Sequence, residues 1–236
     1  NKSVMLQSFN EGFALSPLVV LADPKRVKHL MLSDSNSEYS TPISYLFSKQ
    51  LEEADLILIN KKDTIRDNEQ RELVEFLKRK YKNTSVKCIS AIQNEYVEEI
   101  THLIINGTFV SKAGIDVDYN KFKSIEASLG WLNSNAFVRY DQDVDVNSLM
   151  DEYMKTVKKE LVISGCHIAH MKCYAIADDD FYKASITSND DEISINSEMT
   201  LKHDAFNIII NARIISSPDV LKHIFENNLK IIFHPQ

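Results

Sequence analysis

The chain has 236 residues, of which 44% are hydrophobic and 26% are charged, a balance typical of a folded globular protein. Its formal net charge of −7 argues against a general nucleic-acid binder, which needs a basic surface. The sequence holds no run near the roughly 18 apolar residues of a membrane span, so we expect no membrane partner. Three cysteines without a framework pattern indicate a reducing, cytoplasmic setting.

The first part of the chain, residues 1–110, alternates apolar strands with amphipathic helices. The elements that we expect are a strand over 18–23 closed by Pro24, a helix opened by Pro42, a strand over 55–59, a helix capped by Asp67, a strand over 86–90 and a helix capped by Asn94. Strands of this kind, alternating with helices, predict an α/β fold with a parallel sheet covered on both faces. Ligands of such sheets bind beyond the carboxyl ends of the strands.

Two short motifs follow the second and third of these strands, and together they predict a base-binding site. The second strand ends in Asn60-Lys61-Lys62-Asp63, and the third ends in Ser90-Ala91. A carboxylate at position 63 can accept from both N1–H and the exocyclic amino group of guanine, and adenine offers no such pair. Asn60 would brace the loop, and the stem of Lys61 would cover the base plane. The alternative is a Lys-rich surface loop beside an unrelated strand end.

A phosphate-binding loop of the GxxxxGK[ST] type does not occur in the sequence. The glycines are Gly12, Gly107, Gly114, Gly130 and Gly165, and none of them is followed by Lys-Ser or Lys-Thr. For this reason, and because the chain starts without Met, we expect it to be the C-terminal part of a longer protein. The alternative is a relative that has lost its phosphate site. The catalytic residues therefore stay unknown.

The second part of the chain predicts a smaller α+β domain over residues 123–236, after a linker over 111–122. Its expected order is β-α-β-β-β-α. The elements are a strand over 127–140, a helix over 146–163 stopped by Gly165, strands over 167–177, 183–187 and 206–214, and a helix opened by Pro218. On the first of these strands we expect Trp131 and Tyr140 to lie in the core.

Two clusters in the second part are candidates for metal binding, and we expect neither to be a metal site. Soft ligands crowd one strand as Cys166, His167, His170 and Cys173. Strand alternation would place His167 and Cys173 on one face and the other two on the opposite face, so the four cannot converge on one ion. The acidic run 178–180 is expected to be a solvated hairpin turn.

The first part also resembles the CobW/HypB/UreG class of metal-chaperone P-loop GTPases. The resemblance lies in residues 16–24, 50–63 and 88–91. Residues 126–133 look like the start of the C-terminal domain of a CobW-like subgroup associated with cobalamin or corrinoid proteins. The fold implied is part of a P-loop GTPase-type parallel sheet with flanking helices. The family pattern places a backbone N–H of the Ser-Ala loop against the guanine O6, and so assigns guanine binding to Asn60, Lys61, Asp63, Ser90 and Ala91.

By this resemblance, a complete member binds GTP and Mg²⁺, hydrolyses GTP, and helps to deliver a metal or mature a metalloenzyme. The implied partners are a guanine nucleotide and a client metalloprotein or corrinoid protein, with zinc or cobalt as a further candidate cofactor. Two family hallmarks, the phosphate loop and a CxCC metal motif, do not occur in the sequence. The alternative function is a non-hydrolytic protein-binding module derived from such a GTPase.

The charge of the second part suggests a role for it. Residues 111–236 contain 13 Lys and Arg against 19 Asp and Glu, or −6, whereas residues 1–110 contain 14 against 15, or −1. An acidic unit with an apolar face of its own is suited to folding independently and binding a client. The alternative is that it covers the sheet of the first domain.

Overall fold

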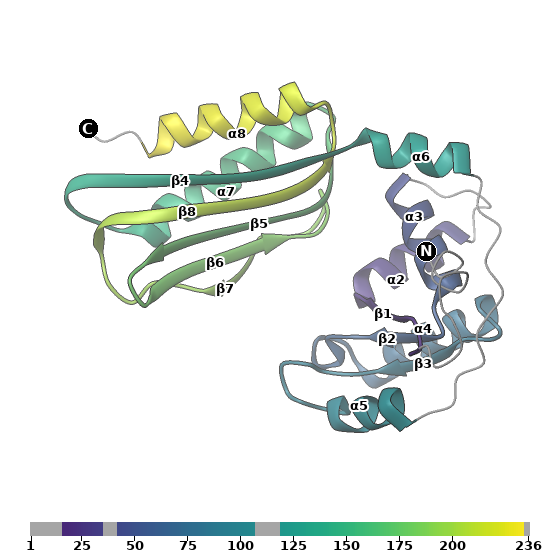
Figure 1. The fold of residues 1–236 in the computed structure, drawn as a ribbon. Coiled ribbons are helices and arrows are strands. Elements are labelled where there is room, and N and C mark those ends of the chain that lie inside the picture. The colour runs from purple at the N-terminus through teal and green to yellow at the C-terminus, as the bar shows by residue number, and fades with distance from the viewer. Residues whose placement is uncertain (1–15, 35–41, 107–118, 234–236) are drawn as a thin grey trace, which may run out of the picture. The chain divides into compact units, whose positions relative to one another are not determined.

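The chain divides into two compact units, residues 1–122 and 123–236. The computed structural model describes residues 16–34, 42–106 and 119–233 (Figure 1). Each unit has its own sheet and its own apolar core. Within those three ranges, no helix combines the length and the apolar character needed to cross a membrane.

The first unit contains a three-stranded parallel sheet in the order β1-β2-β3. Its elements are β1 (Val19–Ala22), α2 (Pro24–Asp34), α3 (Pro42–Glu53), β2 (Leu56–Ile59), a 3₁₀ turn (Lys62–Thr64), α4 (Asp67–Lys80), β3 (Ser85–Cys88) and α5 (Val97–Asn106). In the register of the sheet, Ala22 pairs with Ile59, and Ile59 pairs with Cys88. The carboxyl ends of all three strands therefore lie level at one edge.

Both faces of this sheet are covered, as the apolar strands predict. All four residues of β2 are buried. On one face Ile57 and Ile59 join a core to which α2, α3 and α4 contribute, and on the other face Leu56 and Leu58 pack with Ile100 of α5. The central strand therefore holds the residues that follow it in a fixed position.

Helix α2 departs from the sequence prediction. Pro24 does not simply close the first strand, because it is the first residue of a helix that runs to Asp34. Proline suits that place, since its missing N–H would have had no partner there. The carboxylate of Asp23 accepts from the backbone N–H of Lys25 at 2.9 Å and so satisfies one free N–H of the first turn.

The caps predicted for the next helices are also displaced. Asp67 is the first residue of α4 and does not precede it; Arg66 stands in the cap position, and Glu69 accepts from the Arg66 backbone N–H at 3.0 Å. Asn94 lies three residues before α5 and has a φ of 54°. It belongs to a tight turn, which leaves no room for it to cap the helix.

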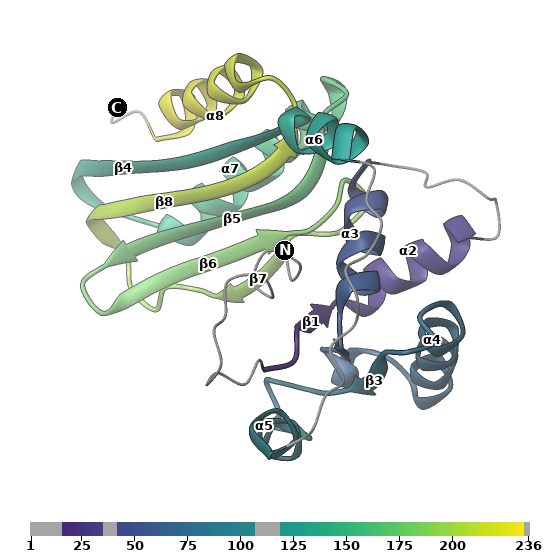
Figure 2. The ribbon, with the colours of Figure 1, turned by 45° about the vertical axis from the view of Figure 1, so that its right-hand side comes forward.

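The second unit contains a five-stranded antiparallel sheet in the order β4-β8-β5-β6-β7. Helix α6 (Tyr119–Ser128) includes the boundary between the two units. The elements after it are β4 (Leu129–Val144), α7 (Val146–Ile163), β5 (His167–Ala177), β6 (Asp180–Ile186), β7 (Ser194–Ser197), β8 (His203–Ile215) and α8 (Pro218–Ile232). Figure 2 shows α7 and α8 with this sheet. Both helices pack into the core on one face of it.

The order β-α-β-β-β-α predicted for this unit is wrong by one strand and one helix. Strand β7 has the sequence Ser-Ile-Asn-Ser and lies at the sheet edge, and so short and polar a segment gives no apolar signal. Helix α6 occupies 119–128, so the last residues of the expected linker 111–122 are helical. The remainder of that linker, 111–118, lies outside the described residues.

The long helix of the second unit is confirmed over Val146–Ile163. The Asp145 carboxylate accepts from the backbone N–H of Ser148 at 3.2 Å and caps its first turn. Gly165, with a φ of 70°, follows its end in the left-handed conformation that favours glycine. The buried side chains of α7 are Val146, Met150, Tyr153, Met154, Val157 and Leu161.

Candidate functional site

The candidate site lies at the carboxyl edge of the parallel sheet. The backbone N–H of Asn60 donates to the carbonyl of Ala22 at 3.0 Å, which ties the end of β2 to the end of β1. On the other side, the N–H of Ile89 donates to the carbonyl of Ile59 at 2.9 Å, and the N–H of Lys62 donates to the carbonyl of Ile89 at 3.0 Å. The two motifs predicted from the sequence are therefore neighbours in space.

Two side-chain hydrogen bonds join these motifs. The Oδ1 atom of Asn60 accepts from the backbone N–H of Ala91 at 3.0 Å. The hydroxyl of Ser90 donates to Oδ1 of Asp63, and Ser90 is 0% exposed. A buried hydroxyl thus holds the carboxylate of an exposed residue in one orientation. All the residues predicted for the base site come together here, with Lys61 between Asn60 and Asp63.

The backbone of the loop is bent tightly after β2. Lys61 has a φ of 63°, a left-handed conformation that non-glycine residues adopt infrequently. Its carbonyl accepts from the hydroxyl of Thr64 at 2.8 Å. The amide of Gln70, on α4, donates to the carbonyls of Lys62 at 3.3 Å and Ile65 at 3.2 Å. The loop is therefore fixed by the helix that follows it as well as by β3.

Asp23 is part of this edge, although from its sequence it was expected only to end a strand. Its Oδ2 atom lies 2.7 Å from Nζ of Lys61, and it thus joins the end of β1 to the loop after β2. The Lys61 side chain, expected to cover a base, is anchored at its tip by this ion pair. The signal that could have identified Asp23 is its place at a parallel strand end, level with Asn60.

The second lysine of the motif, Lys62, contacts the loop after β3. Its ammonium pairs with Glu95 and lies 4.6 Å from the centre of the Tyr96 ring. The hydrogen bond with Glu95 raises the pKa of Lys62 above its usual value. Glu95 in turn exchanges two backbone hydrogen bonds with Ser90, of 3.3 and 2.9 Å. This closes the loop 90–95 and holds Ser90 and Ala91 in place.

A groove of about 800 Å³ lies beside the site, between α4 and β3. Lys62 and Cys88 line it, whereas the five predicted base-site residues are not among its described lining residues. Burial raises the pKa of the Cys88 thiol, which makes this cysteine a poor nucleophile or metal ligand. The groove therefore adds no chemistry to the base site.

The Cys and His cluster of the second unit does not form a metal centre, and the expected alternation of its residues is wrong. A register shift between Ile168 and His170 puts His170 opposite Arg213, while His167 lies opposite Ile215. A bulge of this kind adds a residue and reverses the alternation. Cys166 and Cys173 are buried, and His167 is exposed.

Across the described residues, no group of three or more His, Cys, Asp or Glu side chains could hold a metal ion. The turn predicted for the acidic run is confirmed for Asp178 and Asp179, whereas Asp180 is the first residue of β6 and is only partly exposed. Asp180 accepts from the backbone N–H groups of Thr200 at 2.8 Å and Leu201 at 3.0 Å. Its carboxylate therefore holds a neighbouring loop.

Comparison with known proteins finds a family match within the first unit. The model of the family described as CobW/HypB/UreG, nucleotide-binding domain, matches residues 2–90. These residues contain Asn60, Lys61, Asp63 and Ser90, and they end one residue before Ala91. No curated protein matches the chain.

Two solved structures share a low level of similarity with the whole chain. The Zn(II)-bound YjiA GTPase from E. coli is 14% identical, with a TM-score of 0.32, and the match covers 98% of this chain and 67% of that one. A Zn(II)-bound triple mutant of YjiA GTPase gives 14% identity, a TM-score of 0.31 and the same coverage. Scores of this size do not establish a shared arrangement of the whole chain. The comparison that carries weight is the one over the first segment: residues 2–90 are similar to the CobW/HypB/UreG family of nucleotide-binding domains.

Proposed function

We propose that this chain supplies the guanine-reading end of a GTP-binding and GTP-hydrolysing protein of the CobW-like metallochaperone type. In this proposal Asn60, Lys61, Asp63, Ser90 and Ala91 bind the base. The family match over residues 2–90 supports nucleotide binding. The choice of guanine rests on the chemistry of the loop.

The observation that carries the proposal is the hydrogen bond from Ser90 to Asp63. It fixes a carboxylate at the carboxyl edge of a parallel sheet, where ligands of such folds bind. A carboxylate only accepts hydrogen bonds, so it matches the two adjacent donors of guanine. Adenine would leave the carboxylate without those donors, and an unmatched polar group costs about 1–3 kcal/mol.

In the proposed site, the backbone N–H of Ala91 is a hydrogen-bond donor, whereas the Asp63 carboxylate is an acceptor. It donates to Asn60 in this structure. A guanine O6 that approached Ala91 would share this N–H with Asn60 or replace it as the acceptor. Asn60 thus orients the N–H before the base arrives, which lowers the entropy lost on binding.

The phosphates and Mg²⁺ need groups that the base site does not contain. Backbone N–H groups and a lysine normally cradle the phosphates, and a loop hydroxyl holds Mg²⁺. Since the 236 residues contain no GxxxxGK[ST] motif, we assign these contacts to a phosphate loop in the complete protein. The described residues also offer no cluster that fits a transition metal, so no step of metal transfer is derived from them.

The proposed role of the second unit is to bind a client protein, a metalloenzyme or corrinoid protein whose maturation depends on the nucleotide. In domain terms, residues 1–110 would form the nucleotide-binding part, 111–122 the linker and 123–236 the client-binding part. The alternative is a non-hydrolytic protein-binding module derived from such a GTPase. A nucleotide-dependent change in client affinity would distinguish the first from the second.

The experiment that tests the base site compares GMP with AMP as probes. In a ¹⁵N-labelled chain titrated with millimolar nucleotide, GMP should shift the amide resonances of Ser90 and Ala91, and AMP should not. The variant Ser90→Ala should weaken the GMP response, because Asp63 loses its donor. A matched control is Ser85→Ala, on the exposed start of β3. Equal shifts with both nucleotides would contradict guanine binding.

A further inference from the structure

One face of the sheet in the second unit is covered, and the other is open. Helices α7 and α8 pack against the face that carries Val138, Met171 and Phe206. The opposite face, here called the open face, carries the alternate residues of β4, β8, β5 and β6. Residues that pair across neighbouring strands form four rows on this face. The rows are Trp131-Arg213-His170, Asn133-Asn211-Lys172-Ser185, Asn135-Ile209-Tyr174-Lys183 and Phe137-Asn207-Ile176-Phe181.

Large aromatic side chains on the open face are in contact with solvent. Trp131 is 68% exposed, Phe137 61% and Phe181 45%. We expected Trp131 to lie in the core, and that prediction is wrong. The next residue on the strand, Leu132, packs against the core instead. Exposed aromatic residues that share one face mark an interaction surface.

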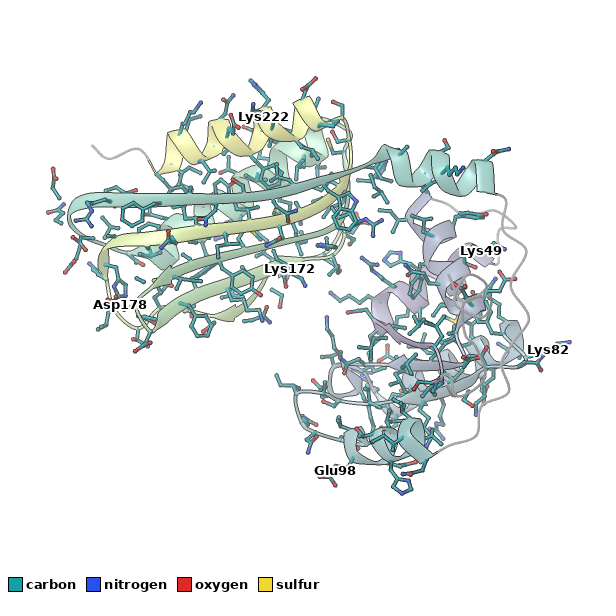
Figure 3. The ribbon with its side chains drawn as sticks, in the orientation of Figure 1. Lys49, Lys82, Glu98, Lys172, Asp178 and Lys222 are labelled. Atoms are coloured by element: carbon teal, nitrogen blue, oxygen red, sulfur yellow. The ribbon has the colours of Figure 1, made fainter. Side chains whose placement is uncertain are left out.

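Positively charged side chains lie close to aromatic rings on the open face. The guanidinium of Arg213 lies 4.6 Å from the centre of the Trp131 ring, and Lys183 lies 5.6 Å from that of Tyr174. Arg139 lies 5.7 Å from the centre of the Phe137 ring. Lys172, labelled in Figure 3, lies in the second row of the open face.

The charge of the open face is opposite to that of the unit. Residues 111–236 have 13 Lys and Arg against 19 Asp and Glu. Arg139, Lys172, Lys183 and Arg213 lie on the open face, whereas none of its paired positions in the rows above holds Asp or Glu. Acidic residues lie outside these rows, namely Asp141 and Asp143 beyond Arg139 on β4 and others at the turn containing Asp178 (Figure 3). A basic face on an acidic unit is complementary to an acidic partner.

We propose that the open face docks an acidic segment of a client protein, with Trp131 and Arg213 at one end of the site and Lys172 and Lys183 at the centre. The proposal rests on the proposed function for the existence of a client. Asparagine side chains in rows two to four offer both donors and acceptors to a peptide backbone. A nucleic-acid strand is the less favoured occupant, because the acidic remainder of the unit would repel a continuous phosphate backbone.

The chain contains a single tryptophan, so Trp131 reports on the open face directly. The probe is a twelve-residue peptide of alternating Glu and Val, which contains no aromatic residue. Titrated into the full chain at low salt, it should change Trp131 emission in a saturable way, and added salt should weaken binding. A peptide with Lys in place of Glu, and single-stranded oligo(dT) of the same number of units, serve as comparisons.

Two double variants with the same change in charge locate the binding. Lys172→Gln with Lys183→Gln should weaken binding of the acidic peptide on the order of fivefold, since exposed ion pairs contribute modestly. Lys222→Gln with Lys230→Gln, on α8, should leave it unchanged. Lys222 is labelled in Figure 3. These substitutions keep long polar side chains, so circular dichroism should show an unchanged fold.

Several results would overturn the proposal. They are no response to the acidic peptide up to millimolar concentration, an equal loss in both double variants, and saturable binding of oligo(dT) without binding of the peptide. Protection of Trp131 from acrylamide quenching in the free chain would also overturn it, because another part of the chain or a second copy would then cover the face. None of these results depends on nucleotide, so they leave the guanine site untouched.

Discussion

The side-chain Oδ1 of Asn60 accepts a hydrogen bond from the backbone N–H of Ala91 at 3.0 Å and links the ends of two neighbouring parallel strands. This hydrogen bond and the one from the Ser90 hydroxyl to Asp63 together join the loop after β2 to the loop after β3. Neither loop is held by its own sequence alone. The position of the Asp63 carboxylate depends on residues 27 positions further along the chain.

The variant Asn60→Ala should loosen the loop after β3. The Ala91 N–H would lose its acceptor, which costs on the order of 1 kcal/mol of unfolding free energy. Hydrogen exchange should show faster exchange at Ala91, while the strand amides keep their protection. Asn68→Ala, on the exposed side of α4, is the matched control. Unchanged exchange at Ala91 in Asn60→Ala would show that this hydrogen bond does not hold the loop.

The strands of the first unit, and the meeting of the loops that follow β2 and β3, could be predicted from the sequence. Continuous apolar runs indicate buried parallel strands, and the ends of such strands meet at one edge. Helix α2 was not predictable in the same way, since Pro24 both ends an extended segment and begins a helix. The contact of Lys61 with Asp23 depends on which strands are neighbours, and a single sequence does not give that order.

The second unit shows a different limit of sequence reasoning. Trp131 and Leu132 are both apolar, so alternation along β4 does not decide which of them faces the helices. The bulge before His170 reverses the faces of β5, and no residue in that segment marks it. Helix α7 was predictable because its apolar residues recur over four turns and Asp145 and Gly165 bound it.

Removal of the α7 cap should destabilise the second unit. Asp145→Ala should lower the free energy of unfolding by about 1 kcal/mol, the usual loss for an N-cap. The side-chain hydrogen bond with Ser148 is the main cause that lowers the pKa of Asp145 below its usual 3.8. As the pH falls, the Asp145 carboxylate is therefore protonated in the unfolded state before it is protonated in the native state.

The contribution of Asp145 should accordingly be complete above about pH 4 and should disappear as the pH falls through the lower native pKa. Urea unfolding of the wild type and of Asp145→Ala from about pH 7 down to about pH 2.5, a range that includes the usual pKa of an aspartate, measures this. Asp141→Ala, an exposed position on β4, is the control. A difference between wild type and Asp145→Ala that stays constant down to the lowest pH would contradict the capping role.

The chain by itself should show weak or undetectable GTP binding and no turnover. Most of the affinity and all of the phosphate chemistry in a P-loop protein come from its phosphate loop and Mg²⁺. The sequence contains no GxxxxGK[ST], and the base site offers only a few hydrogen bonds. Release of phosphate from millimolar GTP with Mg²⁺ is the assay. Turnover that persists after purification to constant specific activity would mean that the chain holds a phosphate site of another kind.

Residues 115–236 should fold as an independent unit. The core of the second unit is built by α7, α8 and the strands β4, β5, β6 and β8, and its buried residues all lie between Val138 and Phe233. Expressed alone, this fragment should give a mixed α/β circular dichroism spectrum and one cooperative unfolding transition. An unfolded fragment would show that the second unit depends on the first.

Guanine recognition by Asp63 is tested most directly by a change of base preference. In Asp63→Asn, the amide would donate where guanine also donates, but it could donate to the C2 carbonyl of xanthine. Ligand-observed NMR on the full chain should show that the wild type prefers GMP to XMP, and that Asp63→Asn prefers XMP. Asp67→Asn, four residues further on at the start of α4, should keep the wild-type preference. A GMP preference that is unchanged in Asp63→Asn would contradict the guanine site.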